Sequence, residues 1–378
     1  MSELKPYKLG DVVSFGNGKA RPASEGNIPI YGGNGILGYC ADNNYDGETI
    51  VIGRVGAYCG ATYYENQPIW VSDNALSAKP KGRNNTKFFY YFLKDMDLNQ
   101  HAGGSSHPLV TQTLLNSLDV EIVECPDEQK AIASVLSSLD DKIDLLHRQN
   151  TTLERMAETL FRQWFVEEAQ EDWEEATLGE VATVQNGYAF SSGDYEEYQE
   201  GFLEVFKMGH IQPGGGLRFN PKADFVPRTE KLKRWTLNKN DIVMAMTDMK
   251  DNMGILGHPA LIDVSEKYVL NQRVARIYLE TTEKLKSIYL LYLQLNTEEA
   301  ISLLQSKANS GVQVNLTTEA IKSIPVSLPP KFVQDKVLIN IEPIFDKLSS
   351  NRFAVKTLEK LRDNLLPKLM SGEVRVAL

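Results

Sequence analysis

The stretch PDEQKAIASVLSSLDDKIDLL, at residues 126–146, decides the fold because the chain repeats it. A related stretch, PKFVQDKVLINIEPIFDKLSS, occupies residues 330–350, and from Gln129 and Gln334 onward the two run at an offset of 205 residues. In both stretches apolar residues recur at alternating steps of three and four, the heptad pattern of helices that pack along a seam. A proline stands at each start, where a helix tolerates it. The sequence therefore predicts two long helices from one duplicated unit.

Each predicted helix needs a partner for its apolar seam. We expect the two helices to pack against each other, antiparallel, in the register whose paired residue numbers sum to 501. Asn150 then faces Asn351, and a buried Asn pair can fix a register. Arg362 falls opposite Leu139 near one end, where it could extend to water. The alternative is that each helix packs on its own domain. The predicted interface residues are Ile132, Leu136, Leu139, Ile143, Leu146, Asn150, Leu153, Leu160, Val337, Ile341, Ile344, Leu348, Asn351, Val355, Leu358 and Leu365.

A second repeat shows that the remainder of the chain is also duplicated. LGDVVSFGNG at residues 9–18 is similar to LGEVATVQNG at residues 178–187, at an offset of 169. Between these anchors lie short β-like runs separated by Gly, Asn and Asp turns. Residues 87–96 and 286–295 are helix-like. The expected fold class is α+β, with two mixed α/β domains, two long antiparallel coiled-coil helices and a pseudo-twofold internal repeat.

The expected boundaries follow from the two repeats. They are a first domain at residues 1–125, a first spacer helix at 126–168, an acidic linker at 169–175, a second domain at 176–329, and a second spacer helix with a C-terminal tail at 330–378.

Composition narrows the class of protein. The 378 residues are 42% hydrophobic and 24% charged, which is ordinary for a globular protein. No apolar run approaches the roughly 18 residues of a membrane span, and the first residues do not resemble a signal peptide. The three cysteines and five histidines show no zinc spacing. We expect a cytoplasmic protein with free thiols, no membrane association and no metal site.

The net charge of −10 argues at first against DNA binding. Most of this charge lies in residues 126–175, which carry 5 Lys and Arg against 13 Asp and Glu. Residues 1–125 carry 10 against 13, and residues 176–330 carry 16 against 18. Because net charge governs solubility and steering rather than what one face binds, each large block can still present a basic face.

Signals for catalysis are weak. YGGNG at residues 31–35 is similar to the glycine loop of some S-adenosylmethionine pockets, but a helix should follow such a loop and none is expected here. No GxxxxGK[ST] phosphate loop occurs. The acids of PDEQK complement a helix dipole, and GGSSHP has no evident carboxylate to complete a triad. We expect no catalytic residue.

Polar residues in glycine-rich or basic settings favour DNA contact instead. Lys and Arg suit phosphates, whereas Arg, Asn and Gln suit base edges. The basic cluster at residues 222–235 is also compatible with an ordinary solvated face, and residues 271–273 with a role in the sheet. The predicted DNA-binding residues are Lys19, Arg21, Asn34, Arg54, Tyr58, Ser105, Ser106, His107, Arg218, Lys222, Lys231, Lys233, Arg234, Lys250, Asn252, Asn271, Gln272, Arg273 and Gln313.

Taken together, these motifs resemble the specificity subunit of type I restriction–modification enzymes. The resemblance lies in the duplicated helix entry, in LERMAETLFRQWF, in LRDNLLPKLMSGEV, and in GETIVIGRVGAYCG followed by WVSDNALSAKP. It implies that each domain reads one half of a split site in double-stranded DNA and that the helices set the gap. Two methyltransferase subunits carrying S-adenosylmethionine would dock on the helices and domains. In a complex that also cuts DNA, two motor-nuclease subunits with ATP and Mg would join.

Two other classes of protein remain as alternatives. A non-catalytic scaffold could hold two globular domains on a coiled-coil rod, and a self-contained DNA methyltransferase would bind S-adenosylmethionine unaided.

Overall fold

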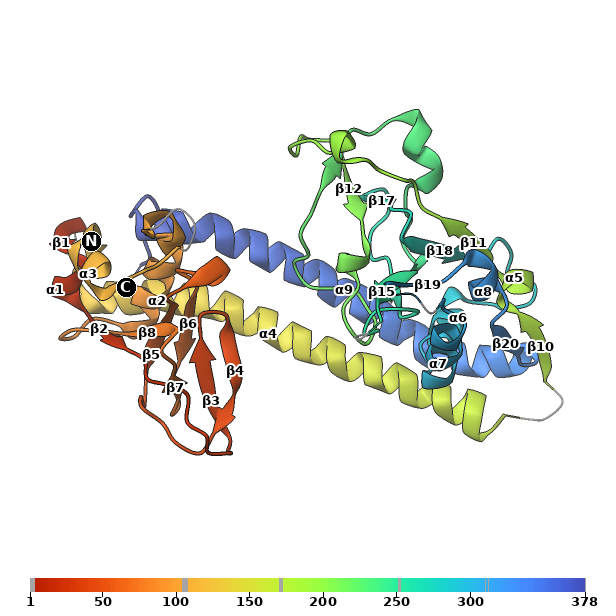
Figure 1. Cartoon of the computed structure of the whole chain (residues 1–378), viewed down its shortest axis with the longest axis horizontal. Helices are drawn as coiled ribbons and strands as arrows, with labels where there is room; N and C mark the ends of the chain where they lie inside the picture. The colour runs from red at the N-terminus through yellow and green to blue at the C-terminus, as the bar shows by residue number, and fades with distance from the viewer. Residues whose placement is uncertain are drawn as a thin grey trace. The chain divides into compact units, whose positions relative to one another are not determined.

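A computed structural model describes residues 4–103, 108–169, 173–250, 253–309, 311 and 313–377. The chain forms two compact units. Unit 1 comprises Met1–His147 with Ala354–Leu378, and unit 2 comprises Arg148–Phe353. Two long helices, α4 (Pro126–Arg162) and α9 (Lys331–Met370), each contribute to both units (Figure 1). The units therefore differ from the expected domains, because each one incorporates about half of both helices.

Unit 1 contains two main sheets. The first is antiparallel and has the order β2-β8-β5-β6, and the second has the order β4-β3-β7 with β3 and β7 parallel. A smaller antiparallel pair joins β1 to β9. The strands are β1 (Leu4–Lys8), β2 (Val13–Asn17), β3 (Ile28–Gly32), β4 (Gly35–Cys40), β5 (Thr49–Gly53), β6 (Thr62–Glu65), β7 (Trp70–Val71), β8 (Ala75–Pro80) and β9 (Asp119–Val123). The short helices are α1 (Leu9–Val12), η1 (Gly56–Tyr58), α2 (Thr86–Asp95), η2 (Leu98–His101) and α3 (Gln112–Ser117).

Unit 2 repeats this topology. Its sheets have the orders β11-β18-β14-β16 and β13-β12-β17, with β12 and β17 parallel, and β10 pairs with β20. The strands are β10 (Glu174–Thr177), β11 (Thr183–Asn186), β12 (Leu203–Phe206), β13 (Phe225–Val226), β14 (Ile242–Ala245), β15 (Thr247–Met249), β16 (Pro259–Leu261), β17 (Tyr268–Leu270), β18 (Val274–Tyr278), β19 (Gln313–Asn315) and β20 (Pro325–Leu328). The helices are α5 (Leu178–Val181), η4 (Ser192–Asp194), η5 (Met208–His210), η6 (Glu230–Trp235), α6 (Ile288–Leu295), α7 (Glu298–Ser306) and α8 (Thr318–Lys322).

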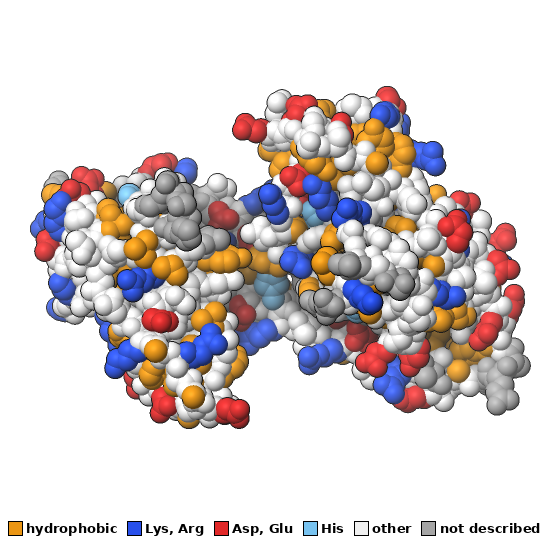
Figure 2. All heavy atoms as spheres, in the orientation of Figure 1, with side chains coloured by type: hydrophobic (Ala, Val, Ile, Leu, Met, Phe, Trp, Pro, Cys, Tyr) orange, Lys and Arg blue, Asp and Glu red, His pale blue; other side chains and the backbone are white. Residues whose placement is uncertain are grey.

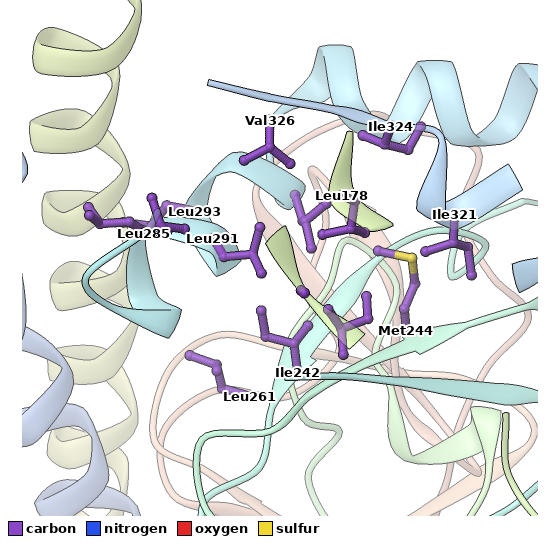
Figure 3. Close-up of a cluster of buried hydrophobic side chains, with 14 of the residues drawn as sticks. Leu178, Ile242, Met244, Leu261, Leu285, Leu291, Leu293, Ile321, Ile324 and Val326 are labelled. Atoms are coloured by element: carbon purple, nitrogen blue, oxygen red, sulfur yellow. The ribbon is translucent and has the colours of Figure 1, made fainter. Parts of the chain in front are cut away.

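The repeated LG-acid-V motif lies near the start of each unit and places its leucine in the core. Leu9 and Leu178 are fully buried, and their N–H groups donate at 2.8 Å to the carbonyls of Leu118 and Ile324, respectively. In unit 2, Leu178 lies among apolar side chains from β14, α8 and β20 (Figure 3). The motif therefore serves packing, with α1 and α5 as single turns that place a leucine in each core.

A buried glutamine anchors the start of each long helix. The Oε1 atom of Gln129 accepts a 2.8 Å bond from the N–H of Asn85, and its Nε2 donates to the carbonyl of Val123 at 2.7 Å. Gln334 makes the matching bonds, from the N–H of Lys286 at 2.8 Å and to the carbonyl of Pro329 at 2.9 Å. Because a buried amide must be hydrogen-bonded, these contacts explain why both copies of the repeat contain glutamine here.

The two long helices pack together and run antiparallel. The Nδ2 atom of Asn351 donates to Oδ1 of Asn150 at 3.0 Å, and both side chains are buried. This is the contact that the register summing to 501 predicts. Of the predicted interface residues, the half-buried ones are Leu139, Leu153, Leu160, Leu358 and Leu365, and the others are buried. The first seam residue of each helix also belongs to a hydrophobic core, Ile132 to that of unit 1 and Val337 to that of unit 2. Each helix therefore packs both on a domain and on the other helix.

Two details differ from the expectations. Arg362 does not extend to water, since only 19% of its side chain is exposed and its Nη1 donates to Asp140 at 2.8 Å. Tyr91 donates to the other oxygen of Asp140 at 2.6 Å, so the charge is retained inside because it is paired. The expected acidic linker is also shorter, because β10 already begins at Glu174. Residues 170–172 lie outside the described residues.

Candidate nucleic-acid interface

In unit 1, three chain segments meet at the turn between β7 and β8. The N–H of Ala75 donates to the carbonyl of Ser72 at 3.0 Å, which closes a four-residue β-turn. Gly18, just after β2, crosses this turn so closely that a Cβ would lie 1.8 Å from the carbonyl oxygen of Ser72. Arg54, just after β5, donates its backbone N–H to the carbonyl of Asn74 at 3.0 Å. These contacts hold the three segments together.

Unit 2 has the same arrangement at the turn between β17 and β18. The N–H of Val274 donates to the carbonyl of Asn271 at 3.0 Å. A Cβ on Gly187 would lie 2.2 Å from the carbonyl oxygen of Asn271. Met246 donates its N–H to the carbonyl of Arg273 at 3.0 Å. Both glycines are required because only a residue without a Cβ permits such a close approach of backbones.

We call each meeting point the loop junction. It is formed by residues 18–19, 53–54 and 72–75 in unit 1, and by residues 187–188, 245–246 and 271–274 in unit 2.

The structure brings together part of the predicted DNA-binding set in unit 1. Lys19, which is exposed, and Arg54, which is half-buried, belong to the loop junction, and Tyr58 on η1 is 54% exposed. The Nε atom of Arg54 has no hydrogen-bond partner among the described residues. Arg21 and Asn34 are exposed but lie outside the junction. Three further predicted positions fall outside the described residues, namely Ser105, Ser106 and His107.

In unit 2, a cluster of cations and aromatic rings adjoins the loop junction. Lys231, Lys233 and Arg234 are exposed on η6. Lys231 donates a 2.5 Å hydrogen bond to the hydroxyl of Tyr188, and this bond raises the pKa of Lys231. The ring of Tyr188 lies 5.0 Å from that of Trp235. Tyr188 belongs to the junction, and its role could not be found from the sequence because only the fold brings it beside η6.

The other predicted residues of unit 2 are distributed differently. Gln272 and Arg273 are exposed in the loop junction. Lys250 and Gln313 are exposed at the paired strands β15 and β19, which adjoin the junction through Met246 and Thr247. The exposed residues Arg218 and Lys222 lie in the connection between β12 and β13. The structure does not describe Asn252.

Asn271 differs from Gln272 and Arg273 in its exposure. Its side chain is buried, with 7% exposed, and its Oδ1 accepts a 3.2 Å bond from the N–H of Arg273. The carboxamide oxygen of Asn271 therefore stabilises its own turn, and most of the side chain is withdrawn from solvent. This burial favours the alternative for the segment, a role in the sheet, for Asn271, whereas Gln272 and Arg273 are exposed.

The part of the chain that the structure describes contains no group of three His, Cys, Asp or Glu side chains able to hold a metal ion. In that same part, no helix has both the length and the apolar character that crossing a membrane requires. On the face shown in Figure 2, Lys and Arg are spread over both units among acidic side chains, which agrees with the near-balance of charge in each block.

Comparisons with known proteins place this fold. A model of the type I restriction modification DNA specificity domain matches residues 1–155 and 170–357. The MjaIX specificity subunit of Methanocaldococcus jannaschii is 24% identical over 348 residues, covering 82% of this chain and 74% of that protein. The MjaVIII specificity subunit of the same organism is 26% identical over 323 residues, covering 80% and 73%.

A solved structure shows the same fold. The S subunit of a type I restriction–modification system from M. genitalium aligns with a TM-score of 0.61 and 17% identity, over 98% of this chain and 96% of that one. Because the matching model covers most of the chain, this protein belongs to the family of type I restriction–modification DNA specificity subunits, with two target-recognition domains and no catalytic role of its own.

Proposed function

We propose that each unit reads one half of a bipartite target in double-stranded DNA and that its loop junction faces the base edges. The observation that carries this proposal is that the same junction is built twice around different exposed side chains. Corresponding backbone contacts give both junctions a similar geometry, whereas the side chains supply different donors and acceptors. Base edges are discriminated by such donors and acceptors in the major groove.

The cations beside the junction of unit 2 suit the phosphate backbone. The short helix η6 exposes Lys231, Lys233 and Arg234, and Lys231 is hydrogen-bonded to Tyr188. Phosphate contacts position a protein on DNA without specifying sequence. Replacing these cations would therefore weaken binding to all sequences and reduce its dependence on salt.

We assign two further roles to the helices α4 and α9, namely spacing of the half-sites and docking of partner subunits. We assign them the role of setting the number of unread base pairs between the two half-sites. Three apolar side chains of α9 remain exposed at intervals of 7 and 14 residues, with 63% of Phe332, 73% of Ile339 and 75% of Phe353 accessible. Their spacing places these side chains on one face of the helix. We assign this face to two methyltransferase subunits that carry S-adenosylmethionine. Complexes that also cut DNA would add two motor-nuclease subunits with ATP and Mg, in the cytoplasm.

Co-expression with the cognate methyltransferase subunit tests the proposal. Methylated adenines mapped by single-molecule sequencing should define a split motif with a fixed gap. A single uninterrupted motif would show that the two units do not read separate half-sites.

A further inference from the structure

We infer that Asp73 and Asn74 are specificity-determining residues of unit 1, in the positions that Gln272 and Arg273 occupy in unit 2. The inference rests on the proposed function and adds two residues that the sequence did not indicate.

The turn at residues 72–75 and the turn at residues 271–274 make corresponding backbone hydrogen bonds. Beyond the closing bonds of 3.0 Å, the N–H of Ser72 donates to Tyr31 on the parallel strand β3 at 2.8 Å. The N–H of Asn271 likewise donates to Phe206 on the parallel strand β12 at 3.1 Å. Lys19 forms a parallel bridge to Ser72, as the residue after Gly187 does to Asn271. Position for position, Asp73 therefore matches Gln272, and Asn74 matches Arg273.

Within each turn, the first residue and the two central residues differ in how far their side chains are exposed. The first residue of each turn is buried, with 2% of Ser72 and 7% of Asn271 exposed. The two central residues of each turn are exposed. Within the described part of the chain, none of these four central side chains makes a hydrogen bond or ion pair. Polar side chains without internal partners have their donors and acceptors free for a ligand, and the fixed backbone of the turn holds them at one place in the unit.

The chemistry of unit 1 favours base edges over phosphates. A carboxylate is repelled by the phosphates of the DNA backbone. If Asp73 lies against DNA, it therefore needs a hydrogen-bond donor, and the amino group at cytosine N4 is the natural one. Asn74 can make two hydrogen bonds to adenine, as Gln272 can in unit 2, whereas Arg273 suits guanine. The two half-sites are therefore expected to differ at the base pairs that these turns face.

The test uses the complex with its methyltransferase subunit and a DNA library randomised across both half-sites, from which bound sequences are selected and read. Asn74→Ala and Asp73→Ala should each lower the preference at one base pair of one half-site by roughly tenfold, the order expected for one lost base contact. The other half-site should stay unchanged. Asn66→Ala is the matched control, since Asn66 is exposed and follows β6 at the end of the sheet opposite the junction.

A second variant tests for a gain. Asp73→Gln combined with Asn74→Arg gives unit 1 the turn chemistry of unit 2 and should shift the affected base pair toward guanine. Unchanged preferences, or a uniform loss of binding to all sequences, would overturn the inference. Replacing residues 1–125 with those of another family member serves as the reference. If that exchange alters one half-site while the turn variants do not, the inference fails and the proposed function stands, and if the exchange alters neither, the proposed function fails.

Discussion

At the scale of single residues, we expect the hydrogen bond between Asn150 and Asn351 to fix how α4 and α9 align. Both side chains are buried, and the seam residues on either side of them are apolar. Removing Asn351 leaves the buried amide of Asn150 unsatisfied, which costs more than the loss of an exposed hydrogen bond.

Replacing one or both asparagines tests this. Asn351→Leu should lower the free energy of unfolding by about 1–3 kcal/mol, measured by urea denaturation. Asn150→Leu together with Asn351→Leu should recover most of that loss, because no buried amide is then left unpaired. Gln149, which accepts a 3.4 Å bond from Asn351, is exposed and can bond to water instead. If the double variant were as destabilised as the sum of both single variants, the pair would not be coupled.

A buried acid in unit 2 predicts how stability depends on pH. Burial raises the pKa of Glu204, but hydrogen bonds from His210 at 3.0 Å and Lys267 at 2.9 Å outweigh it, so the pKa lies below its ordinary value of 4.5. A lowered pKa contributes stability that is complete above the ordinary value and is lost as the pH falls through the folded-state pKa.

Unfolding monitored between pH 6 and pH 3 should therefore show a stability loss below about pH 4.5 that is smaller in Glu204→Gln. The substitution removes the titrating group and keeps its shape. An identical acid dependence in both proteins would assign the loss to other carboxylates.

At the scale of elements, the exposed face of α9 is the proposed site for methyltransferase docking. Ile339→Lys should reduce assembly with the methyltransferase subunit at least tenfold, because a charge would be buried in an apolar contact. The isolated chain should keep its stability, since 73% of Ile339 is exposed. Asn340→Lys adds the same charge to the neighbouring exposed position. Equal assembly by both variants, measured by analytical ultracentrifugation, would remove this face from the interface.

The elements also show what the sequence could predict. The long helices were predictable because a heptad pattern repeats over many turns and the chain contains it twice. The loop junction was not, because its matching residues lie at offsets of 169 for Gly18 and Gly187, 192 for Arg54 and Met246, and 199 for the turns. Short strands with different insertions separate them. The burial of Asn271 was not predictable either, because burial in a turn leaves no periodic signal in the sequence.

At the scale of the whole molecule, the helices are proposed to set the gap between the half-sites. Inserting one heptad into α4 and one at the facing position of α9 keeps the seam in register. Each helix grows by about 10 Å, which corresponds to roughly three base pairs of DNA. The methylated motif should keep both half-sites and gain about three unread base pairs. An unchanged gap would show that helix length does not set the number of unread base pairs.

The central claim is that the two units read two half-sites independently, and exchanging one unit's recognition block tests it most directly. Residues 1–125 would be replaced with the corresponding block of another family member, and methylated adenines would be mapped in the resulting complex. We predict that one half of the motif changes while the other half and the gap are retained. Changes in both halves, or in neither, would contradict the claim.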